Sequence, residues 1–189
     1  MYDIPVVGFA AWSGAGKTTL IRQLIPELQA LGLRTAVIKH DVHGLSLDRD
    51  GKDSSEFVRA GAETVLTCSG GELLISEKRG RTLDELLAMV RDADLILVEG
   101  YKEEPIRQIG LSRAGRELPA GQERYEAIVT DRADPGAKIE TFSFEDTKAI
   151  ARFIADHRQV FRMPKDENGG IESARNTGCD DPALAGENR

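Results

Sequence analysis

The chain has 189 residues, of which 40% are hydrophobic and 30% are charged, and its net charge at pH 7 is -7. This length favours one well-buried domain with appendages, because domains of ~100–200 residues are the norm. The negative charge argues against a general affinity for nucleic acid or for an anionic membrane surface, and no apolar run approaches the ~18 residues of a membrane span.

An apolar stretch over residues 6–11 leads into a glycine-rich turn and then into a helical pattern. The turn consists of Trp12, Ser13, Gly14, Ala15, Gly16, Lys17, Thr18 and Thr19. In a phosphate-binding loop of this kind, backbone N–H groups surround the α- and β-phosphates, a lysine reaches the β- and γ-phosphates, and a hydroxyl ligates Mg²⁺. Ala11 replaces the first glycine of the common pattern, but the residues that touch phosphate and metal are present. We therefore predict that this turn binds a nucleotide, with Lys17 also serving catalysis and Thr18 also ligating Mg²⁺.

The residues after the turn predict a strand-helix-strand unit. Apolar residues recur at helical spacing from Leu20 to Leu31, and Gly32 stands where a C-terminal cap belongs. Residues 35–38 then form a short apolar strand. Because such crossovers are right-handed and join parallel strands, the unit predicts a parallel sheet.

The middle of the chain predicts small elements ahead of a second buried strand. In order they are a long polar loop over 41–52, a helix that opens at Ser54, strands over 64–68 and 72–76, and a helix that opens at Thr82 in a capping box. The apolar run over 94–98 predicts a central strand that ends in Glu99 and Gly100. Acids at the carboxyl ends of such strands can hold Mg²⁺ or its water opposite a phosphate loop. We therefore predict Glu99 as a metal ligand and catalytic residue, the alternative being an acid that only turns the chain into solvent.

The last third of the chain predicts three more strands, over 106–111, 127–130 and 138–142, and an exposed loop over 113–126. A final helix is expected to begin at Ser143 and to bury Ile150, Phe153, Ile154 and Val160. Beyond residue 163 the composition is too polar to fold. The expected organisation is a three-layer α/β domain of the P-loop NTPase class over 1–163, with a mainly parallel sheet flanked by helices, and a disordered tail over 164–189.

The sequence says least about which nucleotide base is bound, because the guanine-binding signature Asn-Lys-x-Asp is absent. Asp131, which follows the strand over 127–130, is either an acceptor for a guanine edge or a simple turn acid. Further candidates lie in or beside the polar loop over 41–52, which can bring charged groups to the γ-phosphate, the metal or a second ligand if it closes. They are Lys39, His40, Asp48, Lys52 and Asp53.

Two histidines, His40 and His43, stand beside carboxylates and raise a transition-metal site as an alternative. Their spacing is not that of a helical ligand pair, and no cysteine accompanies them. The two cysteines, Cys68 and Cys179, form no Cys-x-x-Cys pair, so neither zinc nor a disulfide framework is indicated. A reducing cytoplasm fits this cysteine usage best.

Five blocks of the chain resemble the MobB family, the GTP-binding proteins of molybdopterin-guanine dinucleotide biosynthesis. The blocks are residues 9–19, Ile38-Lys39-His40, Gly51-Lys52-Asp53-Ser54, Arg59-Ala60-Gly61-Ala62 and residues 95–102. The resemblance extends from about residue 4 to residue 160. It implies a GTPase of the group that contains the hydrogenase and urease maturation proteins, typically a homodimer, with bound Mg²⁺ and weak hydrolysis. Ala11 of the loop is a feature of the family.

The resemblance also implies a role as an accessory protein. Its expected partners are MobA, the guanylyltransferase that joins GMP to molybdopterin, and the molybdoenzymes that receive the finished cofactor. The dinucleotide cofactor is then an alternative ligand of the same loop, and GTP is expected to order residues 39–53. Three other functions remain as alternatives: a metallochaperone-type maturation GTPase, an adaptor that binds nucleotide without hydrolysing it, and a small-molecule kinase with Arg113, Arg116 and Arg124 as lid residues.

Overall fold

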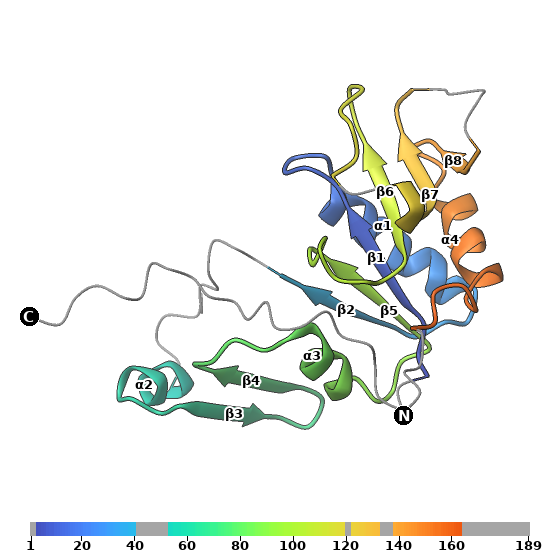
Figure 1. Ribbon diagram of the computed structural model, residues 1–189. Coiled ribbons are helices and arrows are strands. Elements are labelled where there is room, and N and C mark those ends of the chain that lie inside the picture. The colour runs from blue at the N-terminus through green and yellow to red at the C-terminus, as the bar shows by residue number, and fades with distance from the viewer. Residues whose placement is uncertain (1–2, 41–52, 120–121, 133–137, 164–189) are drawn as a thin grey trace, which may run out of the picture. The chain divides into compact units, whose positions relative to one another are not determined.

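The computed structural model describes residues 3–40, 53–119, 122–132 and 138–163 (Figure 1). Within these ranges the chain forms two compact units, one of residues 3–40 and 83–163 and the other of residues 53–82. The predicted tail over 164–189 and the predicted loop over 41–52 lie outside the described residues. None of the described helices is long and apolar enough to cross a membrane.

The larger unit is built on a six-stranded parallel sheet. Its strands are β1 (Val6–Ala10), β2 (Thr35–Lys39), β5 (Leu95–Glu99), β6 (Gln108–Ser112), β7 (Tyr125–Thr130) and β8 (Glu140–Phe142). Their order in space is β2-β5-β1-β6-β7-β8, and every neighbouring pair is parallel. This order confirms the predicted parallel sheet and puts β1, which leads into the glycine-rich turn, between β5 and β6.

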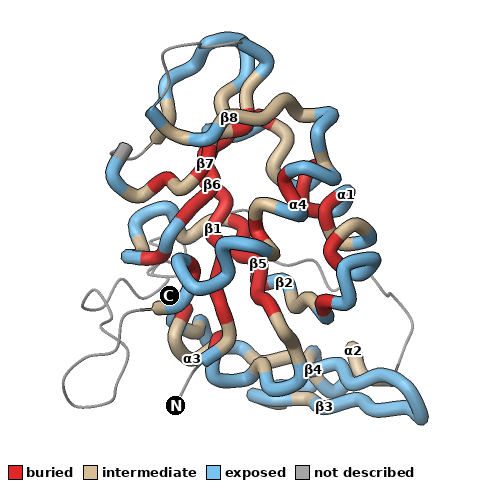
Figure 2. The backbone as a smooth tube through the Cα atoms, turned by 90° about the vertical axis from the view of Figure 1, so that its right-hand side faces the viewer, coloured by how far each residue is buried: buried red, intermediate tan, exposed pale blue. Residues whose placement is uncertain are grey.

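Alternation along the strands gives this sheet two apolar faces. On one face Val7, Phe9 and Leu97 belong to a buried cluster with residues of α1 (Lys17–Ala30) and α4 (Thr147–Asp156). On the other face Val6, Ile96 and Val98 pack with Leu83 and Leu87 of α3 (Leu83–Met89). The central strands are accordingly buried along their length (Figure 2). The predicted three-layer architecture is confirmed.

The smaller unit contains α2 (Asp53–Arg59) and a hairpin of β3 (Thr64–Cys68) and β4 (Leu73–Glu77). The hairpin is antiparallel, with Thr64 opposite Glu77 and Cys68 opposite Leu73. The predicted small helix and hairpin are therefore confirmed to within one residue at their ends.

The last helix differs from its prediction in where it begins and what it buries. Ser143 begins a turn, where its N–H donates to a side-chain oxygen of Asp146 at 3.0 Å, and α4 begins only at Thr147. A turn after α4 also changes the phase of the apolar pattern, so Val160 is 40% exposed while Phe161 is 1% exposed. The prediction that Val160 faces the core is therefore wrong, and Phe161 takes that place.

The predicted exposed loop over 113–126 is also too long. Residues 113–117 are exposed, but the helical turn η1 (Gln122–Arg124) follows, and β7 begins at Tyr125. Tyr125 is 4% exposed and pairs with Gln108 of β6. The strand begins two residues before the predicted residue 127, because Tyr125 is buried. The charged residues on either side of Tyr125 made this segment resemble a loop.

Arg34 and Asp94 join the segments that precede β2 and β5. The N–H and Nε of Arg34 donate to one carboxylate oxygen of Asp94 at 2.9 and 3.0 Å, and its Nη2 donates to the other at 3.1 Å. These hydrogen bonds lower the pKa of Asp94 from 3.8 to about 2. A lowered carboxyl pKa stabilises the fold above the unfolded-state pKa, and that contribution is lost as the pH falls through the folded-state pKa.

We expect Arg34→Ala to lower the urea midpoint of unfolding near pH 5, because the variant lacks this contribution. The difference from the wild type should shrink as the pH falls from about 4 to about 2, where Asp94 becomes protonated in both proteins. Urea denaturation at several acidic pH values measures this convergence. A difference that stays constant down to pH 2 would contradict the assigned role of the pair.

Candidate functional site

The glycine-rich turn joins β1 to α1 at the carboxyl edge of the sheet. Gly14 and Gly16 have φ angles of 77° and 96°, a region that favours residues without Cβ. Gly16 precedes the helix, and no side chain of the described residues caps the first turn of α1. The first N–H groups of a helix have no intrahelical acceptors, so this 14-residue helix presents them together with the positive end of its dipole. The local geometry suits a phosphate.

Lys17 lies against the carbonyl groups of its own loop. Its Nζ donates to the carbonyl oxygen of Ala11 at 3.0 Å and to that of Trp12 at 3.4 Å. Burial lowers the pKa of Lys17, the charge of Glu99 opposes that shift, and the charge of Lys39 adds to it. An anion beside the ammonium group would favour its charged form. The loop thus holds a partly buried cation that gains from binding phosphate.

Thr18 and Glu99 meet across the edge of the sheet. The Thr18 hydroxyl donates to Oε1 of Glu99 at 2.7 Å. Glu99 ends β5 and is only 9% exposed, and its backbone neighbours in the sheet are Phe9 and Lys39. A hydroxyl and a carboxylate are oxygen ligands of the kind that Mg²⁺ takes beside phosphate. The donor set therefore fits Mg²⁺, with Thr18 and Glu99 as the residues that would hold it.

The segment after Glu99 connects the ends of β1 and β2. Gly100 has a φ of 93°, and a Cβ on it would lie 2.9 Å from the Cβ of His40, so only glycine fits without a shift. The rings of Tyr101 and His40 pack with centroids 4.9 Å apart. The Nζ of Lys102 lies 5.4 Å from the centre of the Trp12 ring, whose Nε1 donates to the carbonyl of Glu117 at 2.8 Å. Residues 100–102 therefore brace the phosphate loop against the end of β2.

The remaining predicted site residues fall into three groups. Asp131 follows β7, and its two carboxylate oxygens both accept the N–H of Ala114, at 2.9 and 3.0 Å.

Lys39 and His40 lie at the end of β2, close to Glu99, whose carbonyl accepts the N–H of His40 at 2.9 Å. Asp53 begins α2 in the smaller unit, while Asp48, Lys52 and His43 lie outside the described residues. Within the described ranges, no group of three or more His, Cys, Asp or Glu residues is placed to hold a metal ion.

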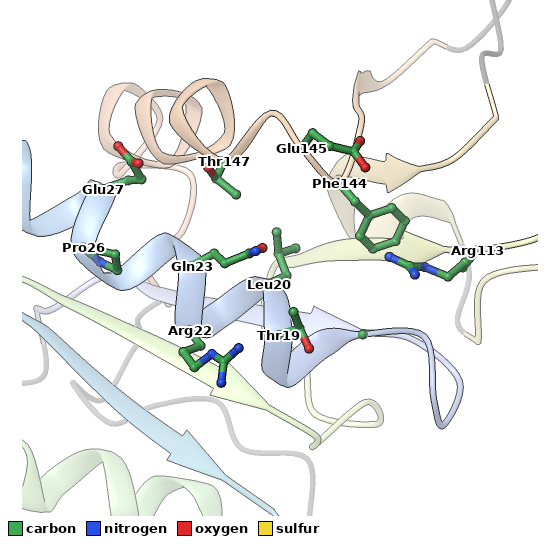
Figure 3. Close-up of a pocket in the computed structure, with 11 residues that line it drawn as sticks. Thr19, Leu20, Arg22, Gln23, Pro26, Glu27, Arg113, Phe144, Glu145 and Thr147 are labelled. Carbon is green, nitrogen blue, oxygen red and sulfur yellow. The ribbon is translucent and has the colours of Figure 1, made fainter.

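A cavity of about 650 Å³ opens beside the phosphate loop (Figure 3). Gly16 and Thr19 line it from the loop and α1, and Arg113, Phe144 and Glu145 line it from the segments after β6 and β8. Sequence reasoning missed Phe144 and Glu145 and considered Arg113 only as a lid residue. The available signal was their position directly after predicted strands, because parallel strands end at the same edge as the phosphate loop.

Comparison with known proteins identifies relatives of this chain. A family model described as MobB, molybdopterin guanine dinucleotide synthesis protein B, matches residues 6–131. A protein of Escherichia coli K12 named molybdopterin-guanine dinucleotide biosynthesis adapter protein is 45% identical over 170 residues, which cover 82% of this chain and 94% of that protein. A protein of the same name from Haemophilus influenzae is 39% identical over 135 residues, which cover 68% and 76% of the two chains.

Solved structures show the same fold. The crystal structure of Bacillus subtilis MobB superposes with a TM-score of 0.64 at 20% identity, covering 80% of this chain and 97% of that one. The structure of a MobB homologue from Bacillus stearothermophilus gives a TM-score of 0.61 at 21% identity, covering 82% and 97%. With the family model matching most of the chain and a close relative covered almost throughout, this chain belongs to the MobB family.

Proposed function

We propose that this chain is a GTP-binding adapter of molybdopterin-guanine dinucleotide biosynthesis, with weak Mg²⁺-dependent GTPase activity. The observation that supports this proposal most is the contact between Thr18 and Glu99 beside Lys17, in a chain of the MobB family. In this proposal the loop from Trp12 to Thr19 binds the phosphates, and Thr18 and Glu99 hold Mg²⁺. The biosynthetic pathway in this proposal is taken from the names of the relatives.

Each residue has a distinct task in the proposed reaction. Lys17 and the loop amides offset the negative charge of the β- and γ-phosphates and fix their position. Mg²⁺, if held by Thr18 and Glu99, would supply further charge neutralisation to the phosphates. Burial lowers the pKa of Lys17, and the negative charge of Glu99 opposes that shift and so favours the charged form of the lysine. Positioning and charge alone support slow hydrolysis, which suits an adapter better than a metabolic enzyme.

Phosphate release from GTP by the purified chain tests the hydrolysis. We expect slow release that requires Mg²⁺ and that is lost in Thr18→Ala, because this substitution removes a proposed metal ligand but leaves the loop backbone intact. Ser69→Ala, which removes an exposed hydroxyl in the turn between β3 and β4, serves as the control. Release that is equally fast in EDTA would count against the proposed metal site.

The proposed partners are a guanylyltransferase of the same pathway and the molybdoenzymes that receive its product. Affinity capture of the purified guanylyltransferase of the same organism, with GTP, with GDP and without nucleotide, tests the adapter role. Capture that depends on nucleotide would favour a switch involving residues 39–53. The alternative that the loop holds the dinucleotide cofactor is tested by competition between that cofactor and GTP.

A small-molecule kinase remains a second candidate, because two arginines lie beside the phosphate loop. Arg113 and Arg116 line a cavity of about 270 Å³ together with Trp12, Ser13 and Gly14. Arginines at such a place can clamp a transferring phosphoryl group. Transfer of the γ-phosphate from GTP or ATP to molybdopterin or to another small acceptor, rather than to water, would favour the kinase.

The hairpin of the smaller unit supports the proposed homodimer. Leu66 stands opposite Ile75 and Cys68 opposite Leu73, so these side chains share one face. Leu66, Leu73 and Ile75 are 64%, 62% and 40% exposed. An exposed group of large apolar side chains is typical of a protein interface. We propose that a second copy of the chain covers this face.

We expect Leu66→Glu to shift the chain from dimer to monomer, because a carboxylate cannot be buried unpaired in an apolar interface. Light scattering after size-exclusion chromatography measures the mass. Thr67→Glu places the same charge on the opposite face of β3 and should leave the dimer intact. A dimer that survives Leu66→Glu would show that this face is not the interface.

A further inference from the structure

The cavity of about 650 Å³ between α1 and the segments after β6 and β8 has no role in the phosphate and metal chemistry described above. Its size falls within the ~300–1,000 Å³ typical of small-molecule sites. Figure 3 shows Arg113 and Phe144 at one end of it and Glu27 and Pro26 of α1 at the other. The cavity therefore offers space for part of a ligand that the phosphate loop does not itself enclose.

The cavity is continuous with the phosphate loop. Gly16 and Thr19 belong to the loop and line the cavity as well. A Cβ on Gly16 would lie 3.8 Å from Nη2 of Arg113, so the guanidinium group stands directly beside the loop backbone. A nucleotide whose phosphates occupy the loop can thus extend its sugar and base into this space. This argument rests on the proposed nucleotide binding.

The cavity carries a hydrogen-bond donor on the segment after β6 and an acceptor on the segment after β8. Arg113 stacks its guanidinium group on the Phe144 ring, with Cζ 4.2 Å from the ring centre. Glu145 is held by the Ser143 hydroxyl, which donates to its Oε2 at 3.1 Å. The two side chains therefore present a positive and a negative group, each kept in place by a neighbour.

We propose that this cavity is the nucleobase site and that Glu145 and Arg113 make it selective for guanine. The N1–H and the 2-amino group of guanine are adjacent donors that a carboxylate accepts together, and its O6 and N7 are acceptors that arginine recognises. Adenine presents the opposite pattern, with an acceptor at N1 and an amino group at C6. An adenine in the same place would leave the carboxylate without a donor and put its amino group against a cation.

Asp131, the base-specificity residue that the sequence suggested, is occupied elsewhere. Both of its carboxylate oxygens accept the N–H of Ala114, in the segment that also carries Arg113. A carboxylate engaged in this way holds the segment after β6 in place. We therefore propose that Asp131 positions the segment after β6, which carries Arg113, and that Glu145 contacts the base.

The test compares the affinities of the full chain for GTP, ATP and XTP by isothermal titration calorimetry. Glu145→Gln should reduce the preference for GTP over ATP by about 10- to 100-fold, as expected for loss of a charged hydrogen-bond acceptor. It should also improve XTP binding, because a glutamine amide can donate to the 2-oxo group of xanthine while its carbonyl accepts from N1–H. Arg113→Gln should weaken GTP binding without improving XTP binding.

Asp131→Asn is the matched control, because it changes another exposed acid at the same edge of the sheet and its amide oxygen can still accept the N–H of Ala114. It should leave the order of preference unchanged. A preference that is unaltered in Glu145→Gln, or that is lost in Asp131→Asn instead, overturns the assignment of Glu145 but leaves the proposed GTP binding standing. Failure of the wild-type chain to bind any of the three nucleotides overturns the proposed function, and the assignment with it. Glu145 is exposed, so the circular dichroism of Glu145→Gln should match that of the wild type.

Discussion

Lys17→Ala is expected to weaken GTP binding by about 100-fold or more, because the substitution removes the one cation that lies within the phosphate loop. In the structure, Lys17 donates to the carbonyl groups of Ala11 and Trp12. These bonds hold the side chain near the place where phosphate would lie. When phosphate binds, a charged hydrogen bond to a phosphate oxygen replaces bonds to neutral carbonyls, and the difference favours the bound state.

The same substitution should leave the fold intact. The lysine side chain is partly buried, and burial already disfavours its charged form. Loss of two hydrogen bonds to loop carbonyls should lower the free energy of unfolding by about 2 kcal/mol, which a stable domain tolerates. Calorimetric titration with GTP and thermal unfolding of the free protein separate the two effects.

Lys148→Ala provides the matched control, because Lys148 is an exposed lysine on α4. It should bind GTP within a fewfold of the wild type. Binding by Lys17→Ala that falls within about fivefold of the wild type, or about 1 kcal/mol, would mean that the loop is not the phosphate site.

Glu99→Gln is expected to remove most of the effect of Mg²⁺ on GTP binding. The substitution keeps the shape of the side chain and an oxygen that can still accept the Thr18 hydroxyl, whereas the negative charge disappears. A neutral amide is a weaker ligand for a hard cation than a carboxylate. The ratio of GTP affinities in Mg²⁺ and in EDTA should fall by about tenfold, corresponding to about 1.4 kcal/mol.

A second consequence concerns Lys17. The charge of Glu99 raises the pKa of Lys17 against the effect of burial, so its loss should lower that pKa further. GTP binding by Glu99→Gln should therefore weaken at a lower alkaline pH than binding by the wild type. Glu103→Gln changes an exposed acid in the following segment and should alter neither property. An unchanged Mg²⁺ effect in Glu99→Gln would refute the metal assignment.

Much of the sheet could be predicted because its central strands are buried on both faces. The runs over 6–10 and 95–98 are continuously apolar, which is the pattern of a parallel strand covered by helices. The positions of the glycine-rich turn and of Glu99 at one edge of the sheet could be predicted for a related reason. A loop that approaches phosphate requires glycines, and an acid that follows a buried strand must lie at the edge where such loops lie.

The last helix and the cavity beside α1, which we propose as the base site, were harder to predict for physical reasons. Val160 matches the helical period of α4, but the helix ends at Asp156, and a turn brings Phe161 into the core instead. Arg113 and Glu145 come from segments far apart in the chain, and only the order of β6 and β8 in the sheet brings both to one cavity. Local sequence patterns do not predict which segments that are distant in the chain will line the same cavity.

The contact of Asp131 with the segment after β6 is another feature that the sequence could not predict. Its place after β7 suited a base-recognising acid, and the sequence contained nothing to show that a backbone N–H from the segment after β6 would occupy its carboxylate. A short acid beside a turn commonly accepts backbone N–H groups. The choice between the two roles depends on a contact between residues 17 positions apart.

The most direct test of GTP binding at this loop uses the emission of Trp12, the only tryptophan in the chain, which lies within the loop. Its ring contacts Lys102 and its Nε1 donates to Glu117, so a ligand in the loop should disturb its surroundings. Titration of the wild-type chain should give a saturable change with GTP that requires Mg²⁺, with a markedly weaker response to ATP. An equal response to ATP and GTP would contradict guanine selectivity, and no response together with no heat of binding would contradict nucleotide binding at this loop.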